Sequence, residues 1–65
     1  MNDFETMKVL FQKSGIEFSA CDRVIRYSGG RLFHHTIELG VGRSFMVVFG
    51  FDELKNMIGH VCTER

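Results

Sequence analysis

Hydrophobic and polar residues alternate most regularly over residues 32–51, which read L-F-H-H-T-I-E-L, then G-V-G, then R-S-F-M-V-V-F-G-F. Side chains alternate across a strand, so each apolar run can turn one continuous face toward a core. A glycine-rich segment separates the two runs, which is typical of a β-hairpin. The shared apolar face is predicted to carry Phe33, His35, Ile37 and Leu39 on the first strand, and Phe45, Val47, Phe49 and Phe51 on the second.

A different spacing at the start of the chain predicts a helix over residues 2–14. Apolar side chains recur there at steps of three and four positions, which places them on one helical face. Asn2 or Asp3 can cap the first turn, and Gly15 suits the left-handed position just after the last turn. The capping signals and the periodicity agree on the same helix.

Two short alternating segments lie between the helix and the hairpin. Residues 16–20 and 23–28 both predict strands, joined by a turn at Cys21 and Asp22. Gly29 and Gly30 predict a tight turn after the second strand, because both tolerate positive φ.

The C-terminal segment, residues 52–62, supports two predictions. A helix, with Asp52 as its N-cap, is the preferred one, because apolar residues follow a helical stripe. Gly59 opposes it, since glycine costs about 1 kcal/mol inside a helix. A strand over residues 57–62, paired with residues 44–51, is the alternative. The stripe consists of Leu54, Met57, Ile58, Val61 and Cys62.

Together these elements predict a single α+β domain over residues 1–65. The N-terminal helix packs on an antiparallel sheet of three or four strands, and the C-terminal helix or extra strand covers the same face or an edge. A chain of 65 residues buries only about 60% of its unfolded surface, so little room is left for a catalytic pocket. We therefore expect a protein that is not an enzyme.

The amino-acid composition limits the classes of partner and the cellular compartment that we expect. The formal net charge is zero, which favours neither nucleic acids nor membrane surfaces as partners. Two cysteines are too few for a disulfide scaffold, and no signal-peptide core or apolar run of about 20 residues is present. These features predict a cytosolic protein with reduced thiols.

Histidines and cysteines give no recognised site. His34 and His35 are adjacent on a predicted strand, so their rings point to opposite faces, and His35 is expected to be a boundary residue of the core. The spacing of Cys21, His60 and Cys62 matches no metal-ligand pattern, and nothing around Cys21 resembles a nucleophile motif. No cofactor or metal is expected.

The local distribution of charge leaves two kinds of partner open. An acidic strip could imitate the phosphates of DNA. A basic patch with a tyrosine for base stacking would instead make the chain a small nucleic-acid-binding module. The residues of that patch would be Arg23, Arg26, Tyr27, Arg31 and Arg43.

The chain also resembles a set of very small proteins from phages and mobile elements. In this set a helix closes in a G-I-x-F step, and a strand ends in F-x-F-D-E before an I-G near the C-terminus. The segment between Asp52 and Ile58 is shorter than in those relatives, which favours a C-terminal helix. The matching residues here are Gly15, Ile16, Phe18, Phe49, Phe51, Asp52, Glu53, Ile58 and Gly59.

Some members of this set are anti-CRISPR proteins, and the chain is most similar to type I-C inhibitors from Pseudomonas elements. The resemblance implies a viral inhibitor in the host bacterial cytoplasm. It would bind a Cas subunit of a type I CRISPR complex without catalysis and block DNA binding or interference, sterically or as a DNA mimic. A monomer is expected, with a dimer as the alternative. The carboxylates expected to contact the partner are Glu17, Asp22, Glu38, Asp52 and Glu53.

An interaction protein with another host or phage partner is the remaining alternative. A stable homodimer formed through an uncovered edge strand would favour it.

Overall fold

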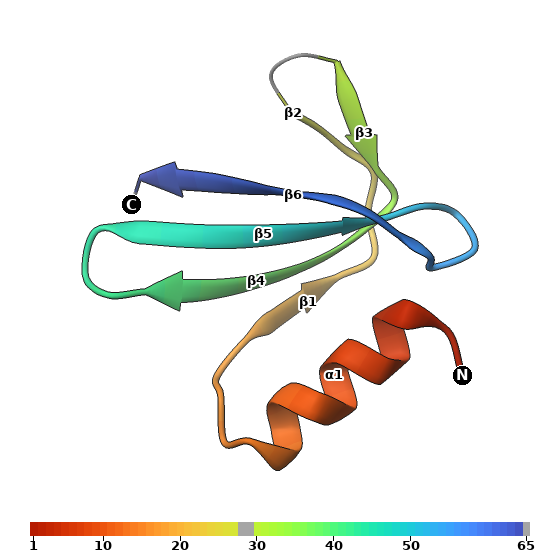
Figure 1. The fold of residues 1–65 in the computed structure, drawn as a ribbon. Coiled ribbons are helices and arrows are strands. Elements are labelled where there is room, and N and C mark those ends of the chain that lie inside the picture. The colour runs from red at the N-terminus through yellow and green to blue at the C-terminus, as the bar shows by residue number, and fades with distance from the viewer. Residues whose placement is uncertain (28–29, 65) are drawn as a thin grey trace.

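The computed structural model describes residues 1–27 and 30–64 of the chain. Within them, one helix and six strands follow in order (Figure 1). Strands β1, β4, β5 and β6 form an antiparallel sheet in the order β1-β4-β5-β6, and β2 and β3 form a separate two-stranded sheet. The predicted α+β class is confirmed. The elements are α1 (Asp3–Lys13), β1 (Ser19–Cys21), β2 (Ile25–Tyr27), β3 (Arg31–Phe33), β4 (His35–Val41), β5 (Phe45–Phe51) and β6 (Met57–Glu64).

Helix α1 forms as the sequence predicts. The Asn2 side chain accepts a hydrogen bond from the Glu5 N–H at 2.8 Å, and Gly15 has the left-handed φ of +71°. Phe4 is fully buried and meets the ring of Phe51 edge to face at 5.1 Å. Together with Ile37, these two rings form the core between the helix and the sheet.

The two faces of the sheet are covered by different elements. On the face toward α1, which we call the helix face, Ile37 lies opposite Phe49. The other face, which we call the hairpin face, carries the buried residues Thr36 and Val48. Phe33 of the β2–β3 hairpin packs over Gly50 on this second face, so that part of the face is buried.

Phe33 is the residue that joins the hairpin to the sheet, and its predicted position is wrong. The sequence places it on the same face as His35 and Ile37. In the structure the chain bends at His34, whose N–H donates to the Phe51 carbonyl at 2.9 Å, and the alternation is interrupted there. Phe33 is buried directly over Gly50, on the hairpin face.

The C-terminal segment is a strand, so the preferred helix is wrong and the alternative holds. Asp52 does not cap a helix; its carboxylate accepts hydrogen bonds from the N–H groups of Leu54 and Asn56 and shapes a tight loop. Lys55 then adopts a left-handed φ of 68°. The Met57 N–H donates to the Asp3 carboxylate at 2.9 Å, which ties the start of β6 to the helix. Backbone pairing with β5 then stabilises the extended chain.

Both covering layers lie at one end of the sheet. Figure 1 shows α1 and the β2–β3 hairpin near the start of β4, whereas the β4–β5 turn and the end of β6 extend away from them. Consistent with this, Val41 and Phe45 beside that turn are 49% and 51% exposed. We call this end the distal end of the sheet. The predicted turn residue Gly29 lies outside the described residues, and Gly30 has the expected positive φ.

Candidate functional site

A groove runs along the outer edge of β4, between that strand and the segment that leads into β1. Its volume is about 830 Å³. We call it the β4 groove. Its lining combines apolar side chains with two carboxylates and two glycines: Gln12, Ile16, Glu17, Phe18, Ser19, Glu38, Leu39, Gly40, Gly42 and Met46.

The groove exists because β1 is much shorter than β4. The last pair between the two strands is Ser19 with Glu38, so β1 leaves the distal part of β4 uncovered. The residues before β1 were predicted to be part of a strand from residue 16, but they stay with the helix instead. The Ile16 N–H donates to the Phe11 carbonyl at 2.9 Å, and the Phe18 ring lies 5.8 Å from the Phe11 ring. Residues 16–18 therefore form one wall of the β4 groove, and β4 forms the other.

Glu17 and Glu38 bring negative charge to the two sides of this groove. Glu17 is exposed on the wall formed by residues 16–18, and Glu38 is half-buried on β4. Burial raises the pKa of the Tyr27 hydroxyl, and the Glu38 carboxylate raises it further by repelling a phenolate. The lining of the groove is mostly polar and includes two anions, an arrangement that suits a partner with basic side chains.

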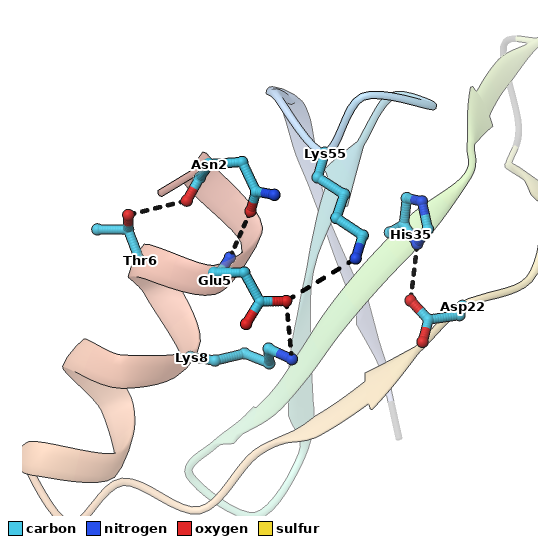
Figure 2. Close-up of polar contacts among 7 residues, drawn as sticks. All are labelled: Asn2, Glu5, Thr6, Lys8, Asp22, His35 and Lys55. Carbon is cyan, nitrogen blue, oxygen red and sulfur yellow. Dashed lines mark hydrogen bonds and ion pairs between the residues drawn. The ribbon is translucent and has the colours of Figure 1, made fainter.

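Asp22 lies elsewhere, in a contact with His35. Its carboxylate is 2.7 Å from the His35 Nδ1, and this hydrogen bond lowers the pKa of Asp22 (Figure 2). Lys55 and Lys8 add a smaller effect in the same direction. Asp22 therefore helps to hold the chain after β1 against β4.

Figure 2 also shows Lys8 and Lys55 directed toward the same Glu5 oxygen, at 3.3 and 3.8 Å. Both ammonium groups lie near the ring of Phe4, 4.7 and 5.4 Å from its centroid. These ion pairs and cation–π contacts lie beside Phe4, at the edge of the core between the helix and the sheet. The charges are engaged with one another, so this cluster is a structural feature of the fold.

Asp52 and Glu53 are in a third place, the loop between β5 and β6. Asp52 is occupied with the backbone of its own loop. Glu53 is exposed beside Leu54, which is 76% exposed. Of the five predicted carboxylates, the structure brings only Glu17 and Glu38 together.

The predicted basic patch is only partly described. Tyr27 packs against Phe33 with ring centroids 5.2 Å apart, so its ring contributes to the fold. Arg26 is exposed on β2, and Arg43 is exposed at the β4–β5 turn. The side chain of Arg31 lies outside the described residues, and Arg23 is exposed before β2. A nucleic-acid-binding role stays a prediction.

Among residues 1–27 and 30–64, no group of three or more histidine, cysteine or carboxylate side chains is placed to hold a metal ion. Cys21 and Cys62 are free thiols. No helix within the same residues is long and apolar enough to cross a membrane.

Comparisons with protein-family models, curated proteins and solved structures find no match to this chain. The lining residues of the β4 groove and their charges are therefore the basis for assigning it a role.

The groove itself was not predicted from the sequence. Alternation places Ile16, Phe18 and Leu39 on apolar strand faces, and it places Met46 on the opposite, mixed face of its strand. The available signal was a difference in length, because a strand of a few residues cannot cover a partner of seven.

Proposed function

We propose that this protein is a non-catalytic inhibitor of the anti-CRISPR kind, which binds a Cas subunit of a CRISPR surveillance complex in the host bacterial cytoplasm. The observation that carries the proposal is the β4 groove, where Glu17 and Glu38 lie on its two sides beside an open strand edge. The link to anti-CRISPR proteins comes from the G-I-x-F resemblance. Its residues Gly15, Ile16 and Phe18 are the ones that turn the chain out of the helix and form the groove wall.

Cas subunits that hold nucleic acid present arginine and lysine side chains to phosphates. In the proposed complex, Glu17 and Glu38 accept those cationic side chains, which the groove buries as anchors. A few such buried anchors supply most of the affinity of a protein interface. The bound inhibitor then occupies surface that target DNA needs.

The test is charge reversal in the groove, measured by pull-down of type I surveillance complexes and by their binding to target DNA. Because Glu17→Lys with Glu38→Lys replaces attraction by repulsion, the double variant is expected to retain at least about tenfold less complex and to restore DNA binding. Circular dichroism and thermal melting confirm that each variant is folded.

The single variant Glu17→Lys is measured in the same assays. Glu53→Lys is its matched control, because both change the net charge equally and both side chains are exposed. Glu53→Lys is expected to inhibit as the unmodified protein does. Asp52 is unsuitable as a control, since its carboxylate holds the β5–β6 loop. Full inhibition by the folded double variant overturns the groove as the binding surface.

A further inference from the structure

Strand β6 forms the edge of the four-stranded sheet opposite β1, and within the described residues its outer side is paired with no strand. Over residues 58–64 it contains no proline, lysine or arginine, and the irregularity in its pairing lies beside Gly50 and Phe51, at its start. Natural edge strands usually carry one of these features to prevent pairing with another chain. This edge is regular along most of its length.

The direction of the backbone groups along β6 follows from its neighbours. The Phe51 carbonyl accepts from His34 on the β4 side, and the Asp52 N–H donates to Asn56 on the β6 side. Successive residues of a strand direct their backbone groups to opposite sides. Met46, Val48 and Gly50 therefore face β6.

Those three residues of β5 lie opposite Thr63, Val61 and Gly59 of β6. These β6 residues use their N–H and C=O groups within the sheet. Alternate residues from Ile58 to Glu64 consequently direct their backbone groups outward, in the spacing of an antiparallel ladder.

We infer that β6 pairs antiparallel with β6 of a second copy of this chain, about a two-fold axis at Val61. In this register Ile58 lies opposite Glu64 of the second copy, and outward-directed residues face one another along the strand. A shift by one residue would place outward groups opposite inward ones and break the ladder. Other registers also keep outward-directed residues opposite one another, but none of them pairs more of residues 58–64 than this one.

Charge and symmetry both favour a second copy as the occupant. Glu64 is the one charged residue of β6 in the described sequence, and the two Glu64 side chains lie at opposite ends of the paired strands, where they do not repel each other. An antiparallel pair of identical strands is closed by a two-fold axis, so assembly stops at the dimer. The result is a continuous eight-stranded sheet, with a β4 groove beside each outer edge.

The register predicts one specific cross-link. Val61 faces Val61 of the second copy as a non-hydrogen-bonded pair, where Cα atoms are about 4.5 Å apart, within the range that a disulfide spans. In a background with Cys21→Ser and Cys62→Ser, Val61→Cys is therefore expected to form a covalent dimer on mild oxidation, seen on a non-reducing gel.

Thr63→Cys in the same background is the matched control. Thr63 lies on the same strand and face, but its counterpart in the second copy is about 13 Å away, at roughly 3.3 Å per residue. It is expected to stay uncross-linked under the same conditions. Equal cross-linking of both variants, or of neither, overturns the proposed register.

The second measurement is the mass of the unmodified protein by light scattering across a concentration series. A mass of twice the 7.5 kDa monomer is expected. Cys62→Pro removes an outward N–H while the inward ladder stays, so it is expected to return the mass to that of a folded monomer. A monomeric mass at every concentration overturns the dimer. The dimer test is separate from the anti-CRISPR test, which uses the opposite edge of the sheet. A confirmed edge-strand dimer would also favour the alternative of an interaction protein with another host or phage partner.

Discussion

Thr36 is the buried polar residue whose hydroxyl, among the described residues, has no hydrogen-bond partner. An unsatisfied buried hydroxyl costs about 1–3 kcal/mol. Thr36→Val keeps the shape and removes the polar group, so we expect it to raise the free energy of unfolding by about 1 kcal/mol, measured by urea denaturation. Thr63→Val, on the same face but half-buried at the sheet edge, serves as the control and is expected to change little. An unchanged or lower stability of Thr36→Val would show that the hydroxyl is satisfied in solution.

The contact of Asp22 with His35 predicts a pH dependence. His35 is the boundary residue that the sequence predicts: its ring lies 5.4 Å from Phe4 and its Nδ1 contacts Asp22. The pKa of Asp22 is lowered below its ordinary value of 3.8 in the folded state, mainly by this hydrogen bond. The contact therefore stabilises the fold above that ordinary value, and this contribution is lost as the pH falls through the folded value.

Asp22→Asn tests this dependence. The unmodified protein is expected to be more stable than the variant above about pH 4, and the difference is expected to shrink as the pH falls further. Thermal melting between pH 7 and pH 2 measures it. A difference that stays constant over that range would mean that the Asp22 carboxylate contributes no pH-dependent stability.

At the scale of elements, the β2–β3 hairpin is held to the sheet by the packing of Phe33 on Gly50. A Cβ at position 50 would overlap the Phe33 ring. Gly50→Ala is therefore expected to lower the free energy of unfolding by about 1–3 kcal/mol, as overpacking of a core does. Phe33→Ala combined with Gly50→Ala is expected to cost less than the sum of the two single changes, because they share one contact. Additive costs in urea denaturation would refute this packing.

Strand β6 shows how an element can mislead sequence reasoning. The stripe from Leu54 to Cys62 has helical spacing, yet Leu54 is 76% exposed and belongs to a loop. The spacing of apolar residues within one segment carries no information on long-range partners. It does not show that backbone groups of β5 are available to pair with this segment, or that Asp3 accepts a hydrogen bond from the Met57 N–H. Long-range pairing therefore decided the conformation of this segment.

At the scale of the whole molecule, the layers are concentrated at one end of a flat body that measures 32 × 31 × 15 Å. The helix buries Phe4, Ile37 and Phe51 there on one face, and Phe33 of the hairpin packs on the other, while the distal end extends beyond them (Figure 1). The sheet has two different edges: a short β1 that leaves a charged groove beside β4, and a long regular β6. The two proposals assign these edges to a Cas subunit and to a second copy of the chain.

Elements with local signals could be predicted from the amino-acid sequence alone. Asn2 and Gly15 delimit α1, and the alternation from residue 35 to residue 51 defines β4, β5 and the face that α1 covers. These features depend on caps, φ preferences and side-chain period, which a short segment carries on its own. The α+β class follows from them.

Three features follow from tertiary contacts instead: the face occupied by Phe33, the strand conformation of residues 57–64 and the composition of the β4 groove. Each depends on residues far apart in the chain: Phe33 packs on Gly50, the Met57 N–H donates to Asp3, and Glu17 and Glu38 line one groove. The sequence identified both groove carboxylates as candidates but could not separate them from Asp22, Asp52 and Glu53. That separation is spatial, because a carboxylate already bonded to its own fold is less available to a partner.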